Sequence, residues 1–496
     1  MKLIRLSALL AAALLLLCGC GYIIIEDYET RGSLTSGPEP YLPSELTLAP
    51  AETLPGQEAV LREPRTEEAK ARLESVYFTD LTNSNLLIAV STDADDSLFS
   101  DETDPFFDFY SIRNEWVTDR YGFALTVMKN SPDQMRAGLA ASVKSGGVDS
   151  DYYADIIEAD AKMSGSLAVA GLLMNLKKLP FYEIPSEGYE ACGIYGTSCY
   201  FDISEATAGY SQRPALYMNT SLAGRELSDQ ISVSAIRGSF GFEELLSAVA
   251  DAALPENCAG LCVSFGDAGY AGIGDIAAAR LGISFTGRVS GYPAVTYVSS
   301  GEAAELSSLL TLLREISLIT EPSADGDPAF DAFREEKALF YVGRLSDIAT
   351  SLRNEKVRWQ VLPLPSGKAG TCCTLSAENR AVLTVPSNNR RIEATALFLE
   401  SVGAATGGWI GDMYANRCLE SSLFRNNNSY FTLLALIDEP VCFDFVYICG
   451  DECKNLSEAT VLAARTCAIS GTPVEDIASP LLADLAKAIK KISLKQ

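Results

Sequence analysis

The sequence predicts an α/β protein in which strands and helices alternate along the chain. Residues 86–91 (LLIAVS) form an unbroken apolar run that is typical of a buried strand. Residues 111–121 then have the pattern of a helix that ends before Gly122, and a second strand follows. The same order recurs at residues 338–352, where a β-forming run leads into apolar positions three and four apart. Such alternation indicates β-α-β units, so we expect mostly parallel sheets.

The first 20 residues have the pattern of an export signal. Lys2 and Arg5 precede an apolar run over residues 8–17, which is too short to span a bilayer comfortably. The run ends in Leu-Cys-Gly-Cys, which resembles a bacterial lipobox and makes Cys20 the expected lipidation site. An ordinary signal peptide with incidental cysteines is the alternative. A lipobox implies that acyl chains tether the protein to the outer face of a membrane.

Residues 21–75 are expected to form a flexible spacer between this signal and the folded part. The segment is polar, and six prolines fall between positions 38 and 64. It buries too little apolar surface to offset the entropy lost on ordering. The alternative is an arm that is partly ordered on the surface of the folded part.

Composition excludes several classes of function. The chain has 496 residues, enough for two or three domains, and a net charge of −26 from 65 acidic and 39 basic residues. Phosphate binding needs clustered lysine and arginine, so we expect no nucleic-acid partner. Because the chain contains no histidine, Ser-His-Asp and Cys-His catalysis and histidine-ligated metal sites are excluded. We therefore predict no enzyme, no cofactor and no metal.

Three other motifs are interpreted as structural. The acidic stretch over residues 93–108 fails as a calcium loop, because Leu98 stands where glycine is needed and Asp104 where a bidentate acid is usual. The glycines at 266–274 match neither the G-x-G-x-x-G pattern nor the Walker A pattern of phosphate-binding loops. The 13 cysteines lack zinc-site spacing, so buried thiols are expected, with one or more disulfides as the alternative.

The stretch from Phe333 to Pro365 organises the second half of the chain. Residues 338–343 read as a strand, residues 345–352 as a helix, and residues 357–362 as a second strand. That strand ends in Leu-Pro-Leu-Pro, which cannot continue a central ladder. The chain is therefore expected to leave one α/β unit at this point and to cross to another.

This block resembles the carbohydrate-type extracellular solute-binding proteins of ABC transporters, the family that includes the maltodextrin-binding proteins. The resemblance covers roughly residues 86–403. The matching pieces are Phe333, residues 338–343, Leu352-Arg353, the Leu-Pro-Leu-Pro at 362–365, Arg113-Asn114, Tyr121-Gly122, Leu179-Pro180, and residues 215–220 with Asn219. The sequence departs from the family at Thr220, where a lysine is usual, and at residues 238–241, where a Gly-x-Trp-Thr motif has become Gly-Ser-Phe-Gly.

The resemblance implies a two-lobe fold with a ligand cleft between the lobes. The first lobe would contain residues 76–214 and 367–408, and the second would contain residues 215–362 and 409–496. Crossings between the lobes are expected near residues 210–216, 362–366 and 402–412. Such a protein would be monomeric and would present a small solute, most simply a sugar, to the permease subunits of an importer. The alternative is a degenerate member with a sensory or protein-interaction role at the cell surface.

Ligands of α/β sheets lie beyond the carboxyl ends of the strands, and sugars are held by aromatic faces and charged or amide groups. We therefore expect solute contacts at the polar residues that end the predicted strands and at aromatic residues near the third crossing. These candidates are Ser91, Asp93, Glu158, Asp160, Arg344, Trp409 and Tyr414.

Overall fold

The structure is a computed structural model, and it places two larger β-sheets within one compact unit that includes residues 51–496. Cys20, Asp93 and residues 21–60 of the expected spacer lie outside the described residues. The described residues are 61–92, 97–99, 104–146, 152–182, 199–202, 210, 212–264, 273–289, 292–320, 327–367, 373–374, 381–421, 423–424, 427–439, 441–442, 446 and 458–482.

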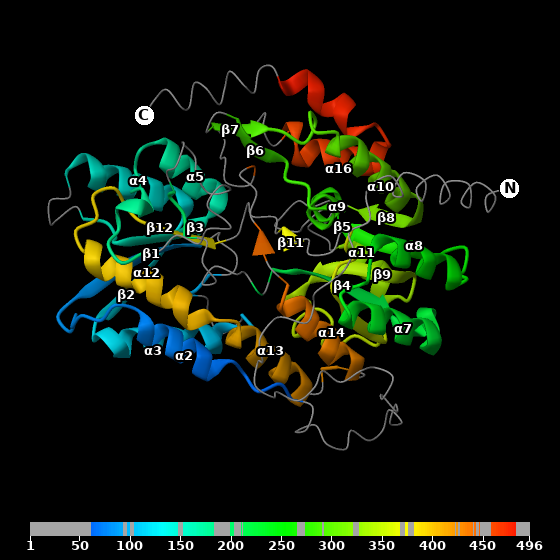
Figure 1. Cartoon of the computed structure of the whole chain (residues 1–496), viewed down its shortest axis with the longest axis horizontal. Helices are drawn as coiled ribbons and strands as arrows, with labels where there is room; N and C mark the ends of the chain where they lie inside the picture. The colour runs from blue at the N-terminus through cyan, green and yellow to red at the C-terminus, as the bar shows by residue number, and fades with distance from the viewer. Residues whose placement is uncertain are drawn as a thin grey trace, which may run out of the picture. The chain divides into compact units, whose positions relative to one another are not determined.

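The first sheet has four strands in the order β12-β3-β1-β2. The strands are β1 (Asn85–Ser91), β2 (Ala124–Asn130), β3 (Ile156–Asp160) and β12 (Ala381–Thr384). β1 pairs in parallel with β2 and β3, and β12 pairs antiparallel with β3. Its helices are α3 (Phe107–Tyr121), α4 (Pro132–Lys144), α5 (Ala161–Val169) and α12 (Ile392–Thr406). Figure 1 shows α4 and α5 on one side of this sheet and α3 and α12 on the other.

The second sheet has five strands in the order β10-β4-β9-β5-β8. They are β4 (Pro214–Asn219), β5 (Ala259–Ser264), β8 (Ser317–Thr320), β9 (Ala338–Arg344) and β10 (Trp359–Leu362). β4 pairs antiparallel with both β9 and β10, whereas β5 pairs in parallel with β8 and β9. Its helices are α7 (Thr220–Ile236), α8 (Phe242–Asp251), α9 (Ile273–Leu281), α10 (Glu302–Ile316), α11 (Pro328–Arg334), α13 (Trp409–Glu420), α14 (Asn427–Ile437) and α16 (Val461–Ser470).

Short elements complete the described part of the chain. A hairpin of β6 (Thr286–Val289) with β7 (Tyr292–Val295) is antiparallel, and β11 (Cys373–Thr374) pairs in parallel with β13 (Val441–Cys442). The 3-10 helices are η4 (Leu176–Lys178) and η6 (Leu345–Ile348). We call the first sheet with its helices the first lobe and the second sheet with its helices the second lobe.

Local sequence explains where several elements begin. Ser131 caps α4 and exchanges hydrogen bonds with Gln134, and Pro132 occupies the first turn. The Asn219 side chain accepts from the backbone of residues 221 and 222 and so begins α7. Gly122 ends α3 at φ 72°, a conformation that suits glycine. These short-range signals fix element ends that the apolar pattern alone leaves open.

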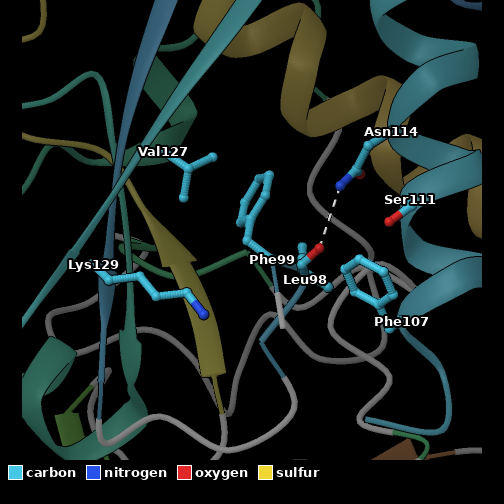
Figure 2. A pocket seen from close by; sticks show the side chains of 7 residues that line it. All are labelled: Leu98, Phe99, Phe107, Ser111, Asn114, Val127 and Lys129. Atoms are coloured by element: carbon cyan, nitrogen blue, oxygen red, sulfur yellow. Dashed lines mark hydrogen bonds between the residues drawn. The ribbon is translucent and has the colours of Figure 1, made fainter. Parts of the chain in front are cut away.

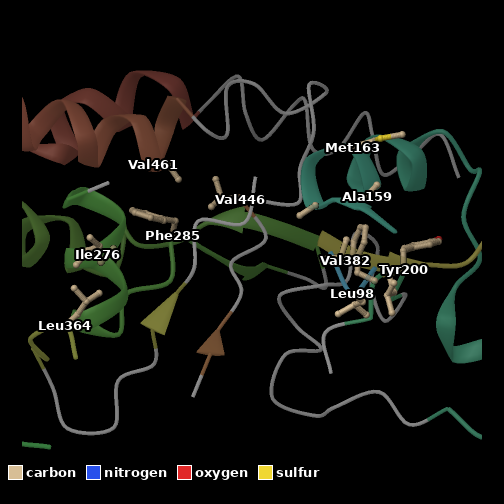
Figure 3. Close-up of a cluster of buried hydrophobic side chains, with 14 of the residues drawn as sticks. Leu98, Ala159, Met163, Tyr200, Ile276, Phe285, Leu364, Val382, Val446 and Val461 are labelled. Carbon is tan, nitrogen blue, oxygen red and sulfur yellow. The ribbon is translucent and has the colours of Figure 1, made fainter. Parts of the chain in front are cut away.

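Continuous apolar strands form the cores. All six residues of β4 are buried, and the first six residues of β9 are buried as well. Burial on both faces explains why these strands are apolar throughout rather than alternating. In Figure 3, Ala159 and Val382, partners on β3 and β12, lie close to Tyr200, and Ile276 and Phe285 lie with Val461 of α16. All six side chains belong to one buried hydrophobic cluster. The predicted α/β class is confirmed.

Two expectations for the order of elements are wrong. Residues 345–352 are expected to form a helix, but only η6 and turns follow β9. The Asp347 side chain accepts a hydrogen bond from the Arg344 backbone N–H and so caps η6. Residues 66–75 of the expected spacer form the helix α2 (Thr66–Ser75), which buries Ala69 and Leu73. The ordered arm that the sequence left as an alternative therefore describes residues 61–75.

Two buried arginines stabilise the segments where the chain passes between the sheets. Arg280 of α9 donates to the carbonyl oxygens of Leu364 (2.6 Å) and Pro365 (3.2 Å), just after β10. The same guanidinium contacts both carboxylate oxygens of Glu439, at 2.8 and 3.0 Å. Arg213, just before β4, donates to the Ile437 carbonyl oxygen at 2.8 Å. The backbone carbonyl oxygens in these connecting segments have no hydrogen-bond partner in a sheet, and the two arginines supply one.

Candidate functional site

Three of the predicted site residues lie together at the carboxyl end of the first sheet. Ser91 ends β1 and is 3% exposed, and the preceding residue Val90 lies opposite Glu158 on β3. Asp160 lies two residues further along β3, where its side chain accepts a hydrogen bond from Met163 N at 2.6 Å and so caps α5. The rule that ligands lie beyond the carboxyl ends of strands, which we call the strand-end rule, therefore selected residues that lie at one edge of the sheet.

Glu158 is fully buried beneath the segment that follows β1. Its two carboxylate oxygens accept hydrogen bonds from Ser97 Oγ and Leu98 N, both at 2.6 Å. Burial raises the pKa of Glu158 from 4.5 to about 7, although these hydrogen bonds and the charges of Arg113 and Lys129 oppose the rise. Glu158 therefore holds a loop in place and does not face a solute, which corrects the prediction for this residue.

A cavity of about 460 Å³ lies beside this loop. Its walls come from the loop after β1, from α3 and from β2, and consist of Leu98, Phe99, Phe107, Ser111, Asn114, Val127 and Lys129. Figure 2 shows the Lys129 and Val127 side chains on β2 facing Phe99, with Asn114 donating to the Leu98 carbonyl oxygen at 3.3 Å. Its volume lies in the range of roughly 300–1,000 Å³ that is usual for small-molecule sites.

Arg344 lies at the carboxyl end of β9 in the second sheet, as predicted. Its backbone carbonyl oxygen accepts from Tyr217 Oη at 2.6 Å, and its backbone N–H donates to Asp347. Burial raises the pKa of Asp347 from 3.8 to about 6, against the lowering effect of this hydrogen bond and of the Arg344 charge. Arg344 is half-buried, so part of its side chain stays accessible.

Trp409 and Tyr414 are core residues of α13 and do not offer free ring faces. Trp409 is 2% exposed and donates from Nε1 to the Ala405 carbonyl oxygen. Tyr414 is 1% exposed, stacks on Phe106 at 4.2 Å between ring centroids, and donates to the Leu345 carbonyl oxygen. Neighbouring side chains thus cover most of both rings, although Tyr414 lines the second cavity described next.

A second cavity of about 460 Å³ shares Phe107 with the first. One wall belongs to the start of α3 in the first lobe, and the others belong to the turn after η6 and to α13 with the residues that follow it. The lining residues are Asp104, Pro105, Phe107, Asp108, Ala349, Thr350, Arg353, Tyr414, Arg417, Cys418, Ser421 and Leu423.

The charges of the second cavity are partly paired. Arg417 contacts Asp108 at 2.9 Å and lies over the ring of Phe109, whereas Arg353 is exposed and has no ion pair within the described ranges. Guanidinium, hydroxyl and aromatic groups together can bind the hydroxyl groups and ring faces of a sugar.

The sequence interpretation missed the cavity residues for identifiable reasons. Lys129 is the penultimate residue of β2. The rule that ligands lie beyond the carboxyl ends of parallel strands therefore applies to Lys129, as it does to the last residues of β1 and β3. Arg353 was part of the Leu-Arg match but was not singled out as a contact. Phe99 and Asp104 lie in the acidic stretch over residues 93–108, which the sequence analysis interprets as structural. No local pattern indicates that α3 and α13 share a cavity wall.

Five cysteines of the described residues have the properties of structural thiols. Cys199, Cys258, Cys262, Cys418 and Cys467 are unbonded, and all but Cys258 are buried. Burial raises the pKa of Cys199 to about 11 and the pKa values of Cys262 and Cys418 to about 12. Among the residues that the structure describes, no three potential ligands cluster into a metal site. Within the same ranges, no helix has the length and apolar character needed to cross a membrane.

No protein-family model matches the chain. No curated protein matches it either. Several solved structures do match, with 10–14% identity. They include the cyclic α-maltosyl-1,6-maltose binding protein from Arthrobacter globiformis (TM-score 0.52, 11% identity, 82% of this chain and 99% of that chain). The sugar-binding protein MalE from Xanthomonas citri matches with TM-score 0.50 and 10% identity, over 82% of this chain and 98% of that chain.

A third match is the galacto-N-biose/lacto-N-biose I-binding protein of the ABC transporter from Bifidobacterium longum (TM-score 0.46, 14% identity, 84% of this chain and 98% of that chain). At such identities a likeness establishes the fold and leaves the ligand open. The chain has the two-lobe α/β fold of ABC-transporter solute-binding proteins, as the sequence predicts.

Proposed function

We propose that the protein is a lipid-anchored receptor that captures a small solute, a carbohydrate, and delivers it to the permease of an ABC importer. Lipid at Cys20 would hold it on the outer face of the bacterial cell membrane, and it would act as a monomer. The observation that carries this proposal is the second cavity, whose walls combine residues of both lobes in a two-lobe fold. A solute held there would be gripped from both sides when the lobes approach.

The cavity chemistry favours a neutral polyhydroxyl compound over a strongly charged one. Arg353 and Arg417 are balanced by Asp104 and Asp108, so the wall carries both signs of charge. Thr350 and Ser421 add hydroxyl groups, and Phe107 adds a half-buried ring. Donors and acceptors side by side next to an aromatic ring suit the alternating polar edge and apolar face of a sugar.

A thermal-shift screen tests this proposal on the chain from Gly21 onward, which retains the arm. The compounds are mono- and oligosaccharides, amino acids and short peptides. We expect one class of carbohydrate to raise the melting temperature, because a ligand that binds only the native state at 100 times its Kd adds about 2.7 kcal/mol. Turnover in a separate hydrolysis assay on oligosaccharides would point instead to an enzyme.

The variant Arg353→Ala links the shift to the cavity. Within the described part of the chain, the exposed Arg353 side chain makes no hydrogen bond or ion pair. Its removal should therefore leave the unliganded melting temperature unchanged and reduce or abolish the shift. Arg334→Ala is the matched control, since Arg334 is an exposed arginine paired with Asp331 on α11. A full shift in Arg353→Ala would place the solute elsewhere.

The alternative of a surface interaction protein is favoured by one feature. Tyr77 and Phe181 are 52% and 46% exposed and stack on each other at 4.3 Å between ring centroids, and the next residue in the chain, Phe78, is 56% exposed. Exposed aromatic side chains are typical of protein-recognition surfaces. A folded protein that shows no shift with any compound class, together with the absence of permease genes beside its own gene, would favour this alternative.

A further inference from the structure

The arm formed by residues 61–75 contacts both lobes. On the first lobe, α2 packs along α12, and Arg120 of α3 donates to the carbonyl oxygens of Glu74 (2.9 Å) and Val76 (2.8 Å). On the second lobe, Arg62 and Arg65 contact Asp438, which follows α14, at 2.7 and 2.9 Å. α14 is itself part of the second lobe, because it packs against β10 and α7.

The strongest contact of the arm is made to α13. Arg65 donates from Nε and Nη2 to the two carboxylate oxygens of Asp412, at 2.8 Å each, and its backbone N–H donates to the same carboxylate at 3.1 Å. Asp412 is completely buried, and Arg65 is 29% exposed. The Arg62 backbone also donates to Tyr430 Oη at 2.6 Å and accepts from Asn416 Nδ2 at 2.8 Å. Bidentate, charge-assisted bonds of this kind are strong and geometrically specific.

The arm covers the link that joins the two lobes between α12 and α13. Gly407 and Gly408 form this link in the left-handed region, with φ of 42° and 76°. The Arg72 guanidinium lies against Gly407, and a Cβ on Gly408 would meet Arg65 Cζ at 2.7 Å. Two glycines between two helices are well suited to absorb the backbone rotation of a hinge.

We propose that residues 61–75 are a clamp that holds the Gly407-Gly408 hinge and restricts the relative motion of the two lobes. The contacts with Arg120, Asp412 and Asp438 join the arm to both sides of the link, so rotation at the link must break some of them. The arm precedes both lobes in the sequence and follows the predicted lipid-bearing segment. If Cys20 is lipidated, events at the membrane reach the hinge through this arm. The clamp itself depends on neither a lipid nor a solute.

The test uses the full-length protein in detergent micelles. The variant Arg65→Met removes the bidentate contact, and the double variant Arg65→Met/Asp412→Leu also removes the buried carboxylate that would be left unpaired. Arg334→Met is the control. Lys144 of α4 and Glu243 of α8, one exposed position in each lobe, are each replaced by an amino acid that carries a spin label without using a cysteine. Pulsed electron resonance then gives the distribution of lobe-to-lobe distances, and hydrogen exchange reports on residues 66–75.

In both Arg65 variants we expect amide exchange in α2 to rise at least tenfold and the distance distribution to become at least twice as wide. Exchange in β3 and β9 should stay as in the native protein, as should every readout of Arg334→Met. An unchanged distance distribution with a released arm would overturn the clamp. Widening in the single variant alone would also overturn it, because the cause would then be a damaged α13. Unchanged exchange in α2 would show that Arg65 does not hold the arm.

Discussion

Replacing Arg280 by methionine is expected to lower the free energy of unfolding by about 3 to 4 kcal/mol, near the lower end of the range for breaking a buried ion pair. The guanidinium side chain is 4% exposed, and Glu439 is 18% exposed. The variant leaves that carboxylate and the carbonyl oxygens of Leu364 and Pro365 without their donor. Urea unfolding of native and variant protein measures the loss.

The free energy of unfolding that Arg280→Met loses should grow with pH. Burial already raises the pKa of Glu439, and the Arg280 charge limits that rise. Without Arg280 the folded-state pKa of this carboxyl rises further, so the variant becomes less stable as pH increases through that value. Arg334→Met, which removes an exposed pair, should change the free energy by only about 0.5 kcal/mol. Equal effects of the two variants would contradict the structural role of Arg280.

Glu158→Gln is expected to stabilise the protein at pH 8, an effect opposite in sign to that of Arg280→Met. Burial raises the folded-state pKa of Glu158 from its ordinary value of 4.5 to about 7, so folding is favoured by protonation of this group. This contribution is complete below about pH 4.5 and is lost as pH rises through about 7. The shift corresponds to about 3 kcal/mol. Glutamine keeps the shape and one acceptor for Leu98 N without the charge.

Thermal unfolding at pH 5 and pH 8 checks this expectation. Native protein should lose stability between the two values, and Glu158→Gln should lose much less. Some slope should remain, because burial also raises the pKa of Asp347 to about 6. Glu243→Gln, on the exposed side of α8, is the control and should keep the native slope. A variant with the full native slope would show that Glu158 is not the group responsible.

The strands were predictable because a strand that is buried on both faces of its sheet consists of a continuous run of apolar residues. The runs at residues 86–91 and 338–343 became β1 and β9 within a residue or two. The arm was not predictable in this way. α2 is mostly polar, and its strongest partner, Asp412, lies 347 positions after Arg65. Contacts so distant in the sequence leave no local period or turn signal.

The sequence predicted which polar residues end the strands of the first sheet, but it did not predict the residues that line the second cavity. The strand-end rule located Ser91, Glu158 and Asp160 at one edge of the first sheet. It could not show that the Glu158 carboxylate turns inward to a loop, because that depends on the backbone position of Ser97 and Leu98. For the aromatic side chains of α13, composition gave no information on exposure. The second cavity depends on segments near residues 104, 350 and 417, which only the folded chain brings together.

The antiparallel strand β12 also affects the order in which the molecule can assemble. It pairs with β3, although about 220 residues separate Asp160 from its partner Ala381. All five strands of the second sheet lie within that interval. A chain that emerges in sequence order therefore completes the second sheet while β3 still has an open edge, which is prone to pairing with other chains. The half-assembled first lobe is the stage at which this protein most needs protection from aggregation.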